Sequence, residues 1–490
     1  MSTINSGNIA ISSEDKPVNS KPSESNDINQ INSEKNNINN INNINNNPPP
    51  QEDLNDSPPY YRLFIYSDTG LCIYKAKTKD IKNQNNNELN DEESDNEGVD
   101  KDLGAIQGII QAIFFTPLDL QCELHMIATD VGLLAYKAFI YDKNALLLAL
   151  IFPNYYADET LSHRISQLLL NYIYSFLLMN IGKKSLFKFS NSNEVEKLRR
   201  IIDIYNDGIH HILNNHSSLT FLLKAEKKLQ IDKDLIYSIK FYLEKIKKSI
   251  KVDLICLTIE NNIVWASSEW LNVNIMDRIL FLMISEIYCE NDFNELPIYF
   301  TRTQLEDEGL GITPYKLICI NLMKDTKLLI ITDNELEIEN IDFSFFDDDD
   351  FFMSRITTMN RITKFNNDIL DTYLKGAVIH NKFLKTYKII GNEELKEVFE
   401  NFLINNVFTN IMFDNDGECL SDQFYVKDNN YYIFYYYRIN ALCFLLLFDK
   451  ETSFDDINAV TSTLKALKDS FDNRENYKDS NEGNIIAKKK

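Results

Sequence analysis

The chain is poor in the residues on which several common functional sites depend. Its 490 residues include only 14 glycines, 11 prolines, seven cysteines and six histidines. So few glycines argue against collagen-like structure, glycine-rich linkers and most glycine-loop phosphate sites. The cysteines are scattered and no two have C-x-x-C spacing, which predicts free thiols in a reducing compartment and no structural zinc.

Basic residues and long apolar runs are also scarce. Fifty lysines and arginines face 73 acidic residues, a formal net charge of −23. Because such a field repels phosphates, we expect no nucleic-acid partner. The most apolar stretches, 104–115, 145–152 and 168–181, are shorter than the roughly 18–20 residues of a membrane-spanning helix. The polar N-terminus has no apolar signal region, so we expect a cytoplasmic protein without a transmembrane segment.

Two segments have the composition of disordered chain. Residues 1–57 are rich in asparagine, with Asn-Ile-Asn-Asn repeats followed by Pro48-Pro49-Pro50. A polar and acidic insert occupies 79–102. Neither segment contains enough apolar surface to offset the entropy lost on ordering, so both are predicted to be disordered. A short polar tail covers 479–490.

The rest of the chain shows one plan of elements three times. A hairpin is followed by a helix, three strands, and one or two further helices. The predicted units are 58–215, 216–375 with a linking helix at 233–250, and 376–478. The third unit begins with a strand-like run at 377–390, and the first ends with a helix over 193–213. This pattern predicts an α/β fold in the broad sense (α+β), with three antiparallel sheets flanked by helices.

Motifs of catalysis and metal binding are largely absent from the sequence. It contains no G-x-S-x-G and no H-E-x-x-H. Gly182-Lys183-Lys184-Ser185 lacks the earlier glycine of a phosphate loop, and a solvated helix end is favoured. The adjacent His210 and His211 point to different sides of a helix, and the acidic run 347–350 is better explained as a charged loop. We therefore predict no catalytic, cofactor-binding or metal-binding residues.

The informative residues are aromatic and apolar. Trp265 is interpreted mainly as a core residue, whereas Trp270 fits an interface and a core equally well. Apolar residues on several faces of the helix at 158–181 indicate burial on several sides, by other parts of the chain or by a partner. The candidate interface or structural residues are Tyr136, Lys137, Phe139, Ile173, Phe176, Trp265 and Trp270.

The order of elements from Tyr60 onward resembles three longin domains in tandem, as in the tri-longin Rab exchange-factor subunits. Within that group the chain most resembles the Fuzzy family of planar cell polarity effectors. Three stretches are similar to that family: Tyr136-Lys137-Ala138-Phe139, Ile263-Val264-Trp265-Ala266 with Trp270, and Leu296-Pro297-Ile298-Tyr299-Phe300. The Asn-rich N-terminus, the insert at 79–102 and the acidic run 347–350 depart from the family, and Tyr136 stands where it has tryptophan.

The resemblance implies a non-catalytic subunit that pairs with an Inturned-like longin subunit through its first longin domain. The pair would act on a Rab-type small GTPase in vesicle trafficking, and in ciliogenesis where cilia exist. A WD-repeat subunit, peripheral membrane contact, and a place at the cytoskeleton or basal body are further implications. The alternatives are a Mon-type subunit of an endosomal Rab exchange factor and a longin adaptor without exchange activity.

Overall fold

The structure is a computed structural model of the 490-residue chain. It describes residues 61–77, 108, 126–129, 132–152, 159–229, 231, 233–300, 313–323, 325–333, 335, 341, 372–391, 395–403, 423–427, 432–439 and 441–475. All of them belong to the unit Pro58–Lys490. The apolar stretch 104–115, the segment 1–57, the insert at 79–102, the acidic run 347–350 and the tail 479–490 lie wholly or almost wholly outside these residues.

The first sheet is antiparallel, with the strand order β2-β1-β5-β4-β3. Its strands are β1 (Arg62–Ser67), β2 (Cys72–Lys77), β3 (Met126–Thr129), β4 (Gly132–Tyr141) and β5 (Asn144–Phe152). After them come α3 (Glu159–Ile181), α4 (Lys183–Leu186), α5 (Ser192–Ile204) and α6 (Asn206–Asn214). Helix α3 packs on β4 and β5.

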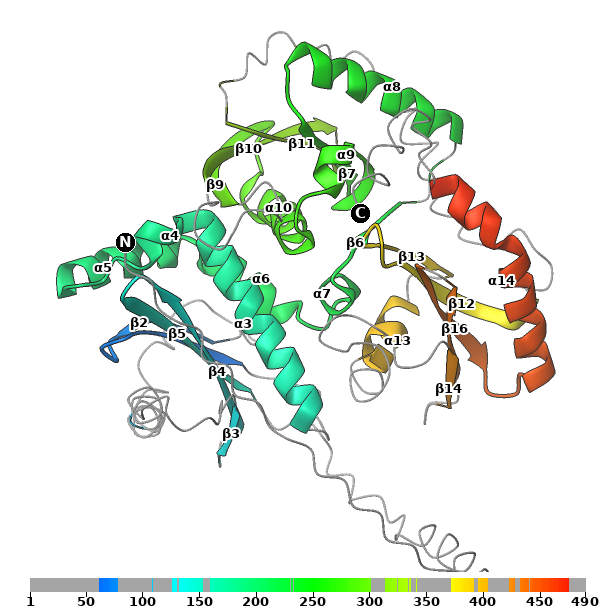
Figure 1. Ribbon diagram of the computed structural model, residues 1–490, viewed down its shortest axis with the longest axis horizontal. Helices are drawn as coiled ribbons and strands as arrows, with labels where there is room; N and C mark the ends of the chain where they lie inside the picture. The colour runs from blue at the N-terminus through cyan, green and yellow to red at the C-terminus, as the bar shows by residue number, and fades with distance from the viewer. Residues whose placement is uncertain are drawn as a thin grey trace, which may run out of the picture. The chain divides into compact units, whose positions relative to one another are not determined.

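The second sheet repeats this plan with the order β8-β7-β11-β10-β9. Its strands are β7 (Leu254–Ile259), β8 (Asn262–Ala266), β9 (Phe293–Phe300), β10 (Thr313–Met323) and β11 (Thr326–Thr332). Between β8 and β9 lie α9 (Ser268–Leu271) and α10 (Ile275–Tyr288). Helix α8 (Lys233–Ser249) precedes the sheet in sequence, and α8 and α10 cover opposite faces of it (Figure 1).

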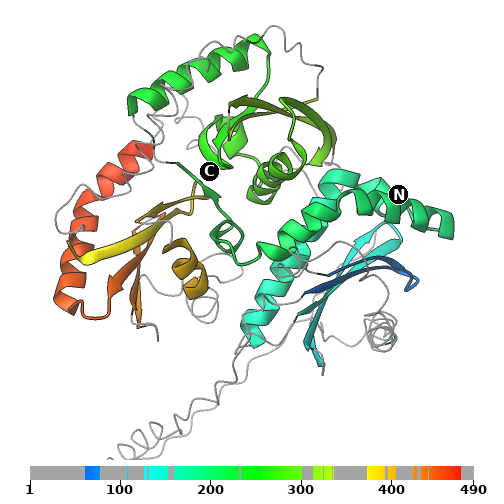
Figure 2. The ribbon, with the colours of Figure 1, turned by 180° about the vertical axis from the view of Figure 1, so that it is seen from behind.

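The third sheet has the order β14-β15-β16-β12-β13-β6, and its first five strands repeat the plan again. Those strands are β12 (Leu374–Asn381), β13 (Thr386–Ile390), β14 (Gln423–Lys427), β15 (Tyr432–Ile439) and β16 (Leu442–Asp449). Helix α13 (Leu395–Phe402) lies on one face and α14 (Phe454–Glu475) on the other, as Figure 2 shows from behind.

The sixth strand of the third sheet comes from a distant part of the sequence. After α7 (Leu219–Leu223), β6 (Glu226–Lys227) pairs in parallel with β13, through Thr386 and Tyr387. The next residue, Lys228, forms a parallel bridge to Ile263 of β8. A segment that precedes the second sheet in sequence therefore joins the edges of the second and third sheets.

One continuous apolar cluster connects the inner faces of all three sheets. It contains residues from α3, α6, α10 and α13 and from every sheet, among them Leu148, Phe281 and Phe434. The outer face of the second sheet is buried separately under α8, and that of the third sheet under α14. The alternation of buried residues along each strand produces these two-sided sheets.

Two expectations about local structure need correction. The helix predicted over 193–213 is two helices, α5 and α6, which meet at Tyr205 (φ −99°). Its N-cap is Asn191, whose side chain accepts from the amide of Glu194. The run 377–390, predicted as strand-like, is a hairpin of β12 and β13, because Asn381 caps the turn by accepting from the amides of Phe383 and Leu384.

Candidate functional site: two buried polar clusters

The first candidate stretch, on β4, is divided between the two faces of the first sheet. Tyr136 is buried with the outer-face cluster that includes Phe64 and Leu134. Lys137 and Phe139 point to the other face, toward α3. There the ammonium of Lys137 donates to Asn171 Oδ1 (2.9 Å), and the Phe139 ring stacks on Tyr174 with centroids 3.6 Å apart. These residues serve the packing of the first unit.

The candidate residues of α3 are buried by the chain itself. Ile173 and Phe176 have no exposed surface. Phe176 packs directly on Gly208 of α6, where an added Cβ would lie 2.1 Å from its ring. Helix α3 also contacts β9 and α10 of the second unit. Burial on several sides is thus confirmed, but the second unit covers much of α3, so its apolar faces no longer argue for a partner.

The two tryptophans lie on opposite faces of the second sheet. Trp265 is in the core beneath α8. Trp270, on α9, has no exposed surface and packs against Phe281, with ring centroids 5.6 Å apart. Its indole nitrogen donates to Glu226 Oε1 at 3.4 Å. Trp270 therefore belongs to the interior, which favours its core interpretation over a surface for a partner.

Trp270 marks the first buried polar cluster, formed by Glu226 of β6 and Arg278 of α10. Arg278 Nη1 lies 2.9 Å from Glu226 Oε2, and the two side chains are 1% and 0% exposed. Arg278 Nη2 also donates to the carbonyl oxygen of Leu384, in the turn between β12 and β13 (3.3 Å). One guanidinium thus connects a helix of the second unit to the edge of the third sheet.

Burial dominates the electrostatics of this cluster. It raises the pKa of Glu226 to about 7, although Arg278 and the Trp270 indole act in the opposite direction. Burial also lowers the pKa of Arg278, and Glu226 opposes that shift. Two buried opposite charges at hydrogen-bond distance compensate each other's desolvation. Because Arg278 binds both Glu226 and the carbonyl oxygen of Leu384, the arrangement is suited to holding two units together.

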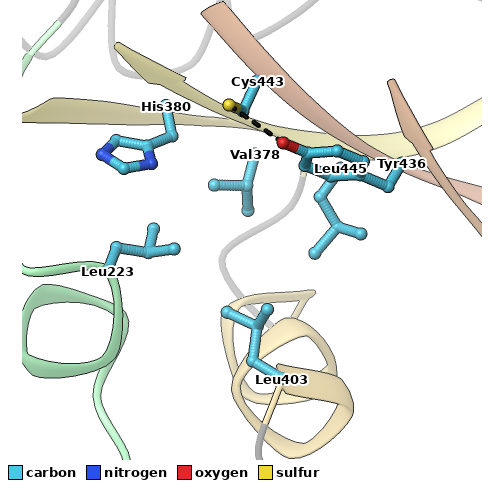
Figure 3. Close-up of a pocket in the computed structure, with 7 residues that line it drawn as sticks. All are labelled: Leu223, Val378, His380, Leu403, Tyr436, Cys443 and Leu445. Carbon is cyan, nitrogen blue, oxygen red and sulfur yellow. Dashed lines mark hydrogen bonds between the residues drawn. The ribbon is translucent and has the colours of Figure 1, made fainter. Parts of the chain in front are cut away.

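The second cluster surrounds a cavity between the third sheet, α7 and the end of α13 (Figure 3). Its volume is about 10 Å³, the space of about one water molecule. Tyr436 donates to Cys443 Sγ at 3.1 Å. His380 stands opposite Cys443 in the register of β12 and β16. The cavity is lined by Leu223, Val378, His380, Leu403, Tyr436, Cys443 and Leu445.

His380 is the unusual member of this second cluster. Its imidazole is buried, and neither ring nitrogen has a hydrogen-bond partner among the described residues. Burial lowers its pKa to about 3, and Lys385 and Lys382 lower it further. The ring is therefore neutral at physiological pH. A cavity of this size admits no substrate or organic cofactor as it stands.

Sequence reasoning missed Glu226, Arg278 and His380. The available signal was a charged residue within an apolar helix: Arg278 falls on the same helical face as Phe281 and Ser285, both buried. Glu226 and His380 had no such signal, because their burial depends on pairing between distant strands. Among the described residues, no three His, Cys, Asp or Glu side chains are grouped so as to hold a metal ion.

Comparison with known proteins identifies no relative. No protein-family model matches the sequence, and no curated protein sequence matches it. Within the described part of the chain, no helix is both long and apolar enough to span a membrane.

Proposed function

We propose that the chain is a tri-longin subunit of the Fuzzy type, which pairs with an Inturned-like subunit and acts with it on a Rab-type GTPase. The observation that supports this most strongly is the repeated topology. Five strands of each sheet share one order, in which the second hairpin strand and the first of the three later strands are the outermost of the five. Three copies of one layered unit suit a scaffold that binds proteins through several surfaces.

The proposed action is guanine-nucleotide exchange by the pair. An exchange factor needs no acid, base or nucleophile, because it binds the switch segments of the GTPase and weakens the hold on nucleotide and magnesium. The cluster of Glu226 and Arg278 fits that role, since it joins two parts of the scaffold.

The first unit offers a surface for the partner. Ile140 at the end of β4 and Ile204 at the end of α5 are 70% and 69% exposed. Apolar side chains in such positions are candidates for burial in a complex, although isolated ones are also common on monomers. We propose that at least Ile204, on the helix that follows the first sheet, contacts the Inturned-like subunit.

The test starts with the tagged full-length chain, purified from its own cells, followed by mass spectrometry of co-purifying proteins. An Inturned-like subunit is expected, and the purified pair should speed GDP release from a Rab-type GTPase by about tenfold or more, a barrier reduction of about 1.4 kcal/mol. Ile204→Asp should abolish pairing, whereas the matched control Phe383→Asp, 83% exposed in the third unit, should not.

Each other outcome points elsewhere. A Ccz-like subunit in place of the Inturned-like one would favour the Mon-type alternative. A stable pair that leaves GDP release unchanged, with every co-purifying Rab-type GTPase, would favour an adaptor. If no longin subunit co-purifies, the proposal fails.

A further inference from the structure

Helices α8 and α14 perform the same structural task but differ on their outward faces. Each covers the outer face of one sheet with an apolar stripe, which includes Ile239 and Leu243 in α8 and Val460 and Leu464 in α14. In α14 one exposed aromatic residue, Phe454, stands at the first position, and the other exposed residues of its first turns are small or polar: Asp455, Asn458, Ala459 and Ser462. Those of α8 include two large aromatic rings. Covering a sheet does not require that difference.

The outward stripe of α8 combines aromatic and basic residues. Tyr237 and Phe241 are one helical turn apart and are 68% and 77% exposed. Lys245 and Lys248 continue the same face and are exposed. Positions i, i+4, i+8 and i+11 lie along one side of a helix, so the four side chains form a single ridge.

The charge of α8 is opposite to that of the chain. The helix has five lysines and two acidic residues, whereas α14 has three basic and five acidic residues. The whole chain carries −23. Lys247 forms an ion pair with Glu269 of α9 at 2.6 Å. In a chain that repels anions at long range, a basic face determines which surface an anionic partner can approach.

We propose that the outward face of α8 binds the surface of a bilayer that contains anionic phospholipids. Tyrosine and phenylalanine rings are suited to the boundary between headgroups and acyl chains, and lysines extend their ammonium groups to lipid phosphates while their stems lie against apolar surface. The opposite face of α8 is packed on the second sheet, so the helix, about 25 Å long, lies along the bilayer surface.

A protein partner fits the same face less well. An aromatic hot spot in a protein interface is normally surrounded by neighbours that exclude water. Here the neighbours of Tyr237 and Phe241 on the exposed face are Asp234, Ser238, Lys245 and Lys248, which are polar or charged. Lipid headgroups complement such a rim directly.

The experiment is co-sedimentation of the purified full-length chain with vesicles, in about 50 mM salt and again in about 500 mM. Vesicles of phosphatidylcholine with phosphatidylserine should bind the chain, and pure phosphatidylcholine should bind it far less. The double variant Tyr237→Gln/Phe241→Gln should lower the partition coefficient about tenfold or more. Lys248→Gln should lower it about fivefold, mainly at low salt. Circular dichroism verifies that each variant is folded.

The matched control is Phe454→Gln in α14, which removes an aromatic ring that is 60% exposed beside Asp455 and should leave vesicle binding unchanged. Three results would overturn the proposal. They are absence of binding to the phosphatidylserine vesicles, binding that survives the α8 changes but is lost in Phe454→Gln, and a dimer in solution that the α8 double variant dissociates. The experiment uses neither a longin partner nor a GTPase, so its failure is distinguishable from failure of the proposed function.

Discussion

The two buried polar clusters differ in how they limit the free-energy cost of burying an ionisable side chain. Glu226 and Arg278 are a charged pair at 2.9 Å with almost no exposed surface. His380 is equally deep but has no hydrogen-bond partner among the described residues. In the first cluster opposite charges compensate each other, and in the second the group stays neutral. The buried ion pair thus lies where it links two units, whereas the buried His380, which links none, is neutral.

The largest effect is expected from removing one member of the charged pair. Arg278→Met leaves Glu226 buried without its cation, which should lower the free energy of unfolding by about 3–5 kcal/mol. Urea denaturation followed by fluorescence measures the change. In the double variant Glu226→Gln/Arg278→Met, part of the loss should be recovered, because no uncompensated charge remains.

A surface pair provides the control for this prediction. Lys316 and Glu295 lie 2.8 Å apart with side chains that are 35% and 43% exposed. Lys316→Met should change the free energy of unfolding by less than about 1 kcal/mol, since water screens such pairs. If Arg278→Met has no greater effect than Lys316→Met, the pair of Glu226 and Arg278 does not hold the second and third units together.

A smaller effect is expected from acid, through His380. Its pKa is lowered to about 3 in the folded protein, whereas the ordinary value is 6.5. Below pH 6.5 the unfolded chain therefore binds the proton first, and stability falls as the pH falls toward 3. His216, lowered to about 4, acts in the same direction. Glu226, raised to about 7, acts in the opposite direction, since its contribution is lost as the pH rises from 4.5 through 7.

The His380 contribution is isolated by His380→Leu. Between pH 7 and pH 5 the wild-type protein should lose about 1–2 kcal/mol more stability than the variant does. Denaturant midpoints measured at both pH values give the difference directly. Parallel loss in the two proteins would show that the imidazole is not kept neutral by burial.

The smallest effect is expected from the same substitution at neutral pH. His380→Leu removes an unpaired buried polar group and fills similar space, so at pH 7.5 the free energy of unfolding should stay within about 1 kcal/mol of wild type. The control is Leu445→Ala, at the same cavity, which should destabilise by about 2–5 kcal/mol. A comparable loss in both variants would mean that His380 has a partner that stabilises it.

Local sequence patterns predicted most elements but not how they join. The expected helix 158–181 is α3 (Glu159–Ile181), and the expected linking helix 233–250 is α8 (Lys233–Ser249), because periodicity is a local property. The two residues of β6 were not predicted, since they carry no strand pattern and become a strand only by pairing with β13. The same holds for the site: Trp270 was identified as informative, but its partner Glu226 lies 44 residues away.

The path of β6 has a consequence for how the chain is made. Thr220, just before β6, shares a hydrogen bond with Tyr387 across 167 residues, and Arg278 reaches Leu384 across 106. On the ribosome, the first and second units emerge well before the strand against which this segment docks. Until β13 and the turn before it are synthesised, Arg278 lacks the carbonyl oxygen of Leu384 and β6 lacks its neighbouring strand. Formation of the third sheet is therefore the last step of assembly. A nascent chain that stops before residue 384 leaves β6 and Arg278 without these contacts and accessible to chaperones and proteases.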